Sequence, residues 1–128
     1  MSTRVLVVDD DPILRRAIEK VLAREGFDVF TAEDAIPALQ TAAVKQPDLA
    51  IVDYNMPTCG LTVVRELKAQ YGDSIFVAVL TGEDSEQMRA HCLGAGADAV
   101  LIKPIAPTEL RRRLIAAALA LKSLPAAS

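Results

Sequence analysis

Three aspartates carry the most distinctive chemistry in this sequence. Asp9 and Asp10 come directly after a short apolar run, and Asp53 comes after a later one. Two further polar residues, Thr81 and Lys103, each follow an apolar run of their own. If these runs are parallel strands, their carboxyl ends meet at one edge of a sheet, where ligands of open α/β folds bind. The sequence therefore predicts that the five residues converge in one cleft.

Three carboxylates at close range repel one another unless positive charge offsets them. Lys103 supplies one charge, and a divalent cation is the simplest source of more. Mg²⁺ uses one or two carboxylates, keeps several waters and accepts phosphate oxygens, so a small open site suits it better than Ca²⁺. Helix capping is the alternative role for such acids. It suits Asp11 but not Asp53, because the following Tyr54-Asn55-Met56-Pro57 offers no obvious helix start.

A carboxylate beside a cation can also act as a nucleophile toward phosphorus. Aspartyl phosphates are a known form of covalent catalysis, and positioning with charge stabilisation provides most of the acceleration in phosphoryl transfer. Asp53 is the candidate acceptor. Thr81 has a hydroxyl to donate to one phosphoryl oxygen, and Lys103 has a point charge for another.

Strand and helix patterns alternate five times along the chain. The predicted strands are Val5 to Val8, Phe27 to Thr31, Asp48 to Val52, Ile75 to Leu80 and Ala99 to Ile102. The first predicted helix starts at Asp11-Pro12 and stops at Gly26, and the others are Asp34 to Lys45, Leu61 to Tyr71, Glu83 to Leu93 and Ala106 to Leu121. Right-handed crossovers then favour a flavodoxin-like, doubly wound five-stranded parallel sheet in order 2-1-3-4-5, with five helices in three α/β/α layers.

The composition fits a single globular domain of 128 residues, with 52% apolar and 24% charged residues. A net charge of −3 gives no general attraction to nucleic acid or to an anionic membrane. The longest late apolar stretch, Leu114 to Leu121, is too short to span a bilayer, and Met1 to Arg4 leads directly into a strand, so we expect a cytoplasmic protein without a signal peptide. Cys59 and Cys92 form no CxxC motif, so we expect reduced thiols rather than a zinc site or a disulfide.

Four segments, in this order and spacing, resemble the receiver domain of two-component response regulators, the CheY-like family. They are Val5-Leu6-Val7-Val8-Asp9-Asp10-Asp11-Pro12, Asp53-Tyr54-Asn55-Met56-Pro57, Leu80-Thr81-Gly82 and Leu101-Ile102-Lys103-Pro104. The resemblance runs from about Arg4 to Leu121. It implies a receiver domain over residues 4–122. The tail over residues 123–128 has no periodicity and is expected to be frayed.

The resemblance implies that Asp53 accepts a phosphoryl group from a histidine kinase or a phosphotransfer protein. Asp10, Asp53 and the backbone carbonyl of Asn55 would bind Mg²⁺ directly, and Asp9 would act through water. The protein would be a signalling phosphoprotein of a phosphorelay that catalyses its own phosphorylation and dephosphorylation, rather than an enzyme with a separate substrate.

The resemblance assigns two further groups of residues. Thr81 and Lys103 would contact the phosphoryl group, and the bond between Lys103 and Pro104 would be cis. The family ties the lifetime of the phosphate to the positions that Asn55 and Glu83 occupy here, a pairing like that of the fast-decaying chemotaxis receiver. We therefore predict relatively rapid self-dephosphorylation.

The sequence departs from the family pattern in two places. The loop Pro57-Thr58-Cys59-Gly60 is one residue shorter than the usual Pro-x-x-Asp-Gly and lacks its acid. Val100 stands where the fifth strand usually carries a Tyr or Phe whose rotamer reports phosphorylation. The readout of phosphorylation is therefore expected to differ. Family members often dimerise or signal through the fourth helix, fifth strand and fifth helix, and an output domain or target protein is the other expected partner.

Simple structural roles are expected for several other residues. His91, the single histidine, is predicted to lie on a helix surface, and Met88 and Cys92 are predicted to pack together at i, i+4 spacing. The run Arg111 to Arg113 fits a solvated helix face better than a nucleic-acid patch.

Two alternatives compete with a phosphorylated receiver. Asp9-Asp10-Asp11 also fits the DxD element of haloacid-dehalogenase-like phosphatases. That family needs further acids after the lysine, however, where only Glu109 follows, and it leaves Asp53 without a role. A degenerate receiver that binds partners without phosphorylation is the second alternative, and the intact five-residue set argues against it.

Overall fold

The computed structural model describes residues 2–123 and contains one sheet of five parallel strands. The strand order is β2-β1-β3-β4-β5, as predicted. The strands are β1 (Arg4–Val8), β2 (Asp28–Ala32), β3 (Leu49–Asp53), β4 (Phe76–Thr81) and β5 (Ala99–Ile102). The order reverses at β1, from which the chain moves first to one edge and then to the other. In doubly wound sheets such a switch point lies beside the ligand site.

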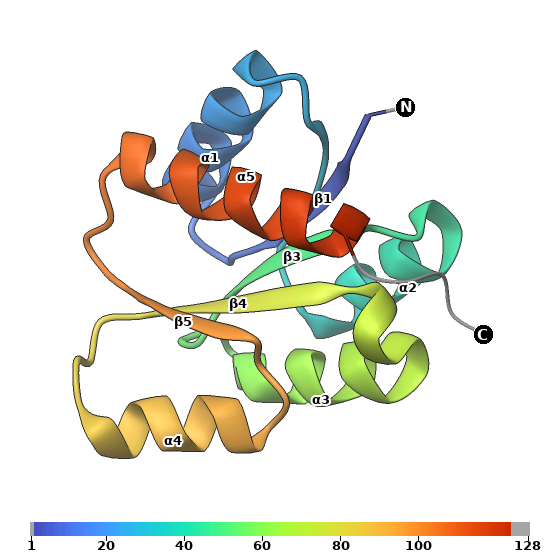
Figure 1. Ribbon diagram of the computed structural model, residues 1–128. Coiled ribbons are helices and arrows are strands. Elements are labelled where there is room, and N and C mark those ends of the chain that lie inside the picture. The colour runs from blue at the N-terminus through green and yellow to red at the C-terminus, as the bar shows by residue number, and fades with distance from the viewer. Residues whose placement is uncertain (1, 124–128) are drawn as a thin grey trace.

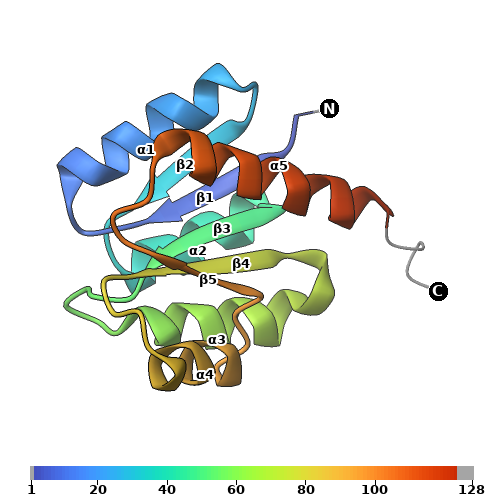
Figure 2. The same cartoon turned by 60° about the vertical axis from the view of Figure 1, so that its left-hand side comes forward.

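Helices cover both faces of the sheet (Figures 1 and 2). Over the described residues they are α1 (Pro12–Arg24), α2 (Ala35–Lys45), α3 (Gly60–Tyr71), α4 (Glu86–Gly94) and α5 (Pro107–Ser123), with a short 3-10 turn η1 (Gly72–Ser74). Each face of the sheet has its own hydrophobic core: α1 and α5 pack on one face, and α2, α3 and α4 pack on the other. The predicted three-layer α/β/α arrangement is confirmed.

Alternation along the central strands supplies these two cores. Val5 and Val7 of β1 pack toward α1 and α5, whereas Leu6 and Val8 pack toward the opposite helices. Because both faces of β1 are covered, its apolar residues form a continuous run rather than an alternating pattern.

The ends of the helices follow local capping chemistry, with one correction to the sequence prediction. α1 begins as predicted, with the Asp11 carboxylate accepting the amide of Ile13 at 2.9 Å. α4 was predicted from Glu83 but begins at Glu86, because the Ser85 hydroxyl caps it by accepting the amide of Met88 at 3.0 Å. Glu83 therefore lies in the loop between β4 and α4, close to the carboxyl edge of the sheet.

Two other expectations concern the ends of the chain and the membrane. The predicted frayed tail lies outside the described residues except for Ser123, the last residue of α5. None of the described helices combines the length and the apolar character that crossing a membrane requires.

Candidate functional site

The strand register brings the predicted site residues to one edge of the sheet. Asp53 is the last residue of β3 and pairs with Leu80 of β4, and Thr81 is the last residue of β4 and pairs with Ile102 of β5. Lys103 directly follows β5, and its amide donates to the Thr81 carbonyl at 2.8 Å. Asp9 directly follows β1. Residues that are up to 94 positions apart thus converge through parallel pairing alone, since 103 − 9 = 94.

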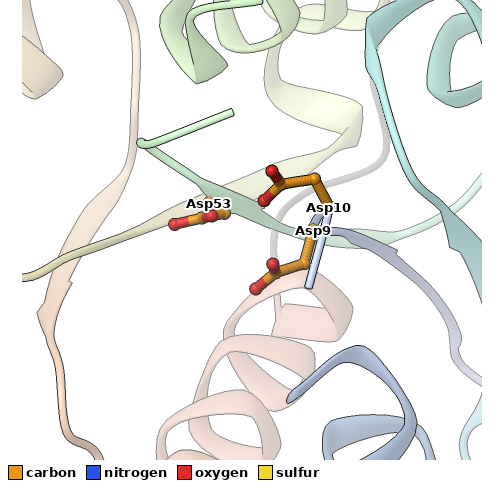
Figure 3. A group of neighbouring side chains, drawn as sticks. All are labelled: Asp9, Asp10 and Asp53. Atoms are coloured by element: carbon orange, nitrogen blue, oxygen red, sulfur yellow. The ribbon is translucent and has the colours of Figure 1, made fainter. Parts of the chain in front are cut away.

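Asp9, Asp10 and Asp53 form an acidic cluster at this edge (Figure 3). One carboxylate oxygen from each lies within 4.8 Å of the others. Asp9 and Asp53 are buried, with 1% and 3% of their surface exposed, whereas Asp10 is exposed. The cluster therefore combines two buried acids with one that opens to solvent.

Asp9 is held by the protein through most of its polar atoms. Its amide donates to the Ala32 carbonyl at 3.1 Å, and its Oδ1 accepts the amide of Asp11 at 2.9 Å. Burial raises the pKa of the Asp9 carboxyl, the hydrogen bond from the Asp11 amide opposes this rise, and the charge of Asp53 adds to it. Among the described residues, Asp9 Oδ2 is the buried side-chain oxygen that has no hydrogen-bond partner.

Lys103 is the cation that contacts the acidic cluster. Its Nζ lies 2.7 Å from Asp53 Oδ1, and the same oxygen accepts the amide of Asn55 at 3.4 Å. The Lys103-Pro104 peptide bond is cis. One lysine charge against three carboxylates leaves an excess of negative charge when all are ionised.

The residues at this edge fit a divalent cation of the oxygen-binding class. A buried carboxylate oxygen without a donor needs a partner, and the three converging carboxylates need positive charge beyond that of Lys103. Hard cations such as Mg²⁺ take carboxylate and carbonyl oxygens and keep part of their water shell. The exposed Asp10 leaves the cluster open to solvent on one side.

Thr81 lies beside this cluster with a buried side chain. Its Oγ1 accepts the amide of Glu83 at 3.2 Å, so its hydroxyl hydrogen can still be donated to another acceptor. The Glu83 carboxylate accepts the hydroxyl of Ser85 at 2.7 Å. The β4–α4 loop therefore links Thr81 to the cap of α4 through two consecutive hydrogen bonds.

Gly60 is a structural feature of the site that the sequence reasoning missed. A Cβ on Gly60 would lie 2.1 Å from the Asp53 carbonyl oxygen, and the Gly60 amide donates to the Tyr54 carbonyl at 3.2 Å. The shortened loop thus brings the first turn of α3 against the backbone of the candidate acceptor. The available signal was the glycine itself, since close backbone approach is one of the few needs that glycine alone meets.

Two positions, Val100 and Tyr54, bear on how the site connects to α4. Val100 is buried in the core on the side of α2, α3 and α4, where it fills core volume as a small side chain. Tyr54, next to Asp53, meets His91 of α4 edge to face, with ring centroids 6.2 Å apart. His91 is exposed, as predicted, and also contributes to this contact.

The remaining predicted residues have structural partners. The Cys92 thiol is buried 3.7 Å from the Met88 sulfur, and both cysteines are free. Arg111 pairs with Glu25 at 3.1 Å, whereas Arg112 and Arg113 both pair with Glu109, at 2.6 and 3.1 Å. Each arginine of the run therefore has an acidic partner, with Glu109 shared by two of them.

Comparisons with known proteins agree with this geometry. A family profile described as "Response regulator receiver domain" matches residues 5–115. The "Response regulator MprA" of Mycobacterium ulcerans is 42% identical over 115 residues, which cover 89% of this chain and 49% of that protein. The protein of the same name from Mycobacterium tuberculosis is also 42% identical, over 89% of this chain and 50% of its own length. The chain thus spans about half the length of these curated relatives.

Solved structures of similar chains give the same picture. The chemotaxis protein CheY4 of Vibrio cholerae superposes with a TM-score of 0.86 at 30% identity, over 91% of this chain and 99% of that one. A CheY-like receiver domain protein of Methanospirillum hungatei superposes with a TM-score of 0.89 at 25% identity, over 95% and 98% of the two chains.

Proposed function

Because this chain belongs to the response regulator receiver domain family, we propose that it accepts a phosphoryl group on Asp53 from a histidine kinase or a phosphotransfer protein. The observation that carries the proposal is the buried Asp53 carboxylate, paired with Lys103 at 2.7 Å inside an acidic cluster. A structural acid would not need two further carboxylates beside it, since their repulsion lowers stability.

In the proposed reaction a carboxylate oxygen of Asp53 attacks phosphorus, and a new O–P bond forms. The N–P bond to the donor's imidazole breaks, and the leaving nitrogen keeps the electron pair of that bond and is neutral on departure or after protonation by water. Lys103 would offset negative charge on the phosphoryl oxygens, and the Thr81 hydroxyl would donate to one of them. Both residues are already anchored at the site, because Thr81 Oγ1 accepts the amide of Glu83 and the Lys103 amide donates to the Thr81 carbonyl.

We propose that Asp10, Asp53 and the Asn55 carbonyl hold Mg²⁺ directly and that Asp9 holds it through water. Bound Mg²⁺ would neutralise charge on the transferred group. The unpartnered Oδ2 of the buried Asp9 and the convergence of the three carboxylates support this assignment.

We also propose that the protein removes its own phosphate relatively rapidly. Asn55 is exposed beside Asp53, and Glu83 lies in the β4–α4 loop, one residue beyond Gly82 and outside α4. Asn55→Ala and Glu83→Ala test the proposal through the half-life of the phosphorylated protein. Unchanged decay in both variants would remove these two residues from the reaction.

The signal would leave the site through the α4, β5 and α5 side, toward an output domain, a target protein or a second copy of the chain. Val100 cannot act as an aromatic switch because it has no ring to reorient. Thr81 can still pull on the β4–α4 loop through the amide of Glu83, and Glu83 is bonded to the cap of α4.

We propose that the receiver domain extends over residues 4–122 and works in the cytoplasm.

An acyl phosphate donor tests the central proposal. The chain is incubated with Mg²⁺ and a small acyl phosphate, and intact mass is measured. We expect one acid-stable, base-labile phosphoryl group on the wild type and on Asp73→Asn, an exposed acid in η1. Asp53→Asn should gain none. Equal gain by Asp53→Asn, or none by the wild type, would contradict the proposal.

The phosphatase alternative has a separate outcome in the same assay. Turnover of unrelated phosphate esters would favour it. The acid that this alternative needs after Lys103 would have to be Glu109, whose carboxylate is engaged by Arg112 and Arg113. The geometry therefore favours the receiver.

A further inference from the structure

Arg15 contacts the segment from Asp9 to Asp11, although it is not a member of the acidic cluster. Its Nη1 donates to the Asp9 carbonyl oxygen at 2.8 Å, and its backbone amide donates to the Asp11 carbonyl at 3.0 Å. A single residue of α1 thus holds the carbonyls on both sides of Asp10. The side chain is half-buried, and it reaches back past the start of α1 to make the bond.

Helix stability does not account for this placement. The first turn of a helix favours negative charge, because its free amides carry partial positive charge. Arg15 adds a positive charge within the first turn of α1, a turn that contains no acid. The favourable term is the charge-assisted hydrogen bond to Asp9, so the role of the side chain lies in the loop.

The bond to Asp9 bears on the orientation of Asp10. The Asp9 carbonyl and the Asp10 amide belong to one planar peptide unit, so fixing the carbonyl fixes the plane from which the Asp10 side chain departs. The amide and Oδ1 of Asp9 are bonded to Ala32 and Asp11. The Asp9 carbonyl accepts a hydrogen bond from Arg15. Among the described residues, Oδ2 is then the one oxygen of the buried Asp9 that has no hydrogen-bond partner.

We propose that Arg15 is a positioning residue for the metal site: it fixes the Asp9–Asp10 peptide and thereby aims the Asp10 carboxylate. The inference rests on the proposed function, because it assumes that the acidic cluster binds Mg²⁺. Partners that orient metal ligands from outside typically change metal affinity by about 10- to 100-fold when they are replaced. Arg15 is such a partner, because it is outside the proposed ligand set and bonds the peptide that joins Asp9 to Asp10.

The test is a calorimetric titration of the 128-residue chain with Mg²⁺ alone. Arg15→Met removes the donor but keeps the apolar stem and the helix propensity. Arg16→Met, the control, removes the same charge from the exposed neighbouring residue of α1. We expect Arg15→Met to raise the Kd for Mg²⁺ about tenfold or more, and Arg16→Met to change it by less than about twofold.

A second readout separates positioning from general damage to the fold. Phosphorylation by a small acyl phosphate should be slow in Arg15→Met at low Mg²⁺ and should return to within about twofold of wild type at saturating Mg²⁺. A structural role alone would lower the melting temperature and leave the Kd unchanged. Arg15→Gln, whose amide ends short of the position of Nη1, should show the same rise in Kd if Arg15→Met folds poorly.

The outcomes distinguish this inference from the proposed function. A measurable Kd for the wild type, matched by the same Kd in Arg15→Met or Arg15→Gln, overturns the role of Arg15 and leaves the receiver proposal intact. An equal rise in Kd for Arg16→Met also overturns it, because charge alone would then explain the effect. Absence of Mg²⁺ binding by the wild type overturns the metal site and the inference together.

Discussion

Lys103 Nζ lies 2.7 Å from Asp53 Oδ1 across 50 positions of sequence. The Asp53 side chain is 4% exposed and that of Lys103 is 29% exposed, so the pair is shielded mainly on the aspartate side. Asp9 and Asp10 crowd the same carboxylate. The lysine therefore offsets repulsion among three acids as well as forming one ion pair.

Replacing Lys103 should destabilise the metal-free protein. Lys103→Met leaves the buried Asp53 carboxylate without its cation, and we expect the free energy of unfolding to fall by about 1–3 kcal/mol, less than for a fully buried pair because the lysine is partly exposed. Urea denaturation with a chelator present measures the change. Lys20→Met, at an exposed position of α1, is the matched control and should be near neutral.

The double variant Lys103→Met/Asp53→Asn identifies the cause of that loss. If uncompensated charge is responsible, removing the Asp53 charge should recover much of the stability. A double variant no more stable than Lys103→Met would show that lysine packing, rather than charge, accounts for the effect.

Asp9 should make the metal-free protein less stable as pH rises. Burial raises the pKa of its carboxyl in the folded state above the ordinary value of 3.8, so the folded chain binds its proton more tightly than the unfolded chain does. Stability from this group is therefore greatest at low pH and is lost as pH rises through the folded-state pKa. At neutral pH the buried charge is a net cost.

Asp9→Asn isolates this contribution. We expect the variant to be more stable than wild type by about 1 kcal/mol or more at neutral pH without metal, since burying a neutral amide costs less than burying a carboxylate. The difference should shrink as pH falls toward 3.8. Chemical denaturation of both proteins across this range measures it, and a difference that does not vary with pH would contradict the assignment.

The alternation of strands and helices could be predicted because each element has a strong local signal. β1 and β3 each contain a continuous run of four apolar residues, and Gly26, at a φ of 86°, ends the first βα unit where the sequence indicated. The start of α4 could not be placed the same way. Glu83 suits a first helical turn as well as Glu86 does, and the hydroxyl of Ser85 selects between them only once it accepts the amide of Met88.

The convergence of Asp9, Asp10, Asp53, Thr81 and Lys103 at one edge of the sheet could be predicted from the sequence, but the difference in burial between Asp9 and Asp10 could not. Asp9 and Asp10 are identical in type and adjacent in sequence, yet one is buried and the other exposed, because consecutive residues after a strand face different sides. The contacts of Arg15 with Asp9 and of Gly60 with Asp53 depend on how α1 and α3 pack against the sheet edge. No local pattern encodes those distances.

The Thr81 hydroxyl should speed phosphorylation without affecting Mg²⁺ affinity. Thr81→Ala removes the proposed donor to a phosphoryl oxygen, and we expect phosphorylation by an acyl phosphate to slow by about 10- to 100-fold. Thr81→Ser keeps the hydroxyl and should retain most of the rate. Stopped-flow phosphorylation at saturating Mg²⁺ measures the rates, and equal rates in the alanine and serine variants would remove the hydroxyl from the reaction.

The close approach of α3 to Asp53 should make Gly60 intolerant of any side chain. An added Cβ would sit 2.1 Å from the Asp53 carbonyl oxygen, so Gly60→Ala must displace either the first turn of α3 or the end of β3. Overpacking of this kind typically costs about 1–3 kcal/mol in the free energy of unfolding. Either shift alters the contact between α3 and the backbone of the proposed acceptor, so phosphorylation should slow as well.

Gly82→Ala is the matched control for Gly60→Ala. A Cβ on Gly82 meets nothing within 4 Å, although Gly82 also lies at the carboxyl edge of the sheet, directly after β4. We expect Gly82→Ala to keep wild-type stability in urea denaturation, while Gly60→Ala loses it. Equal stability of the two variants would mean that the loop after β3 relaxes freely, and the short connection would then not fix Asp53 against α3.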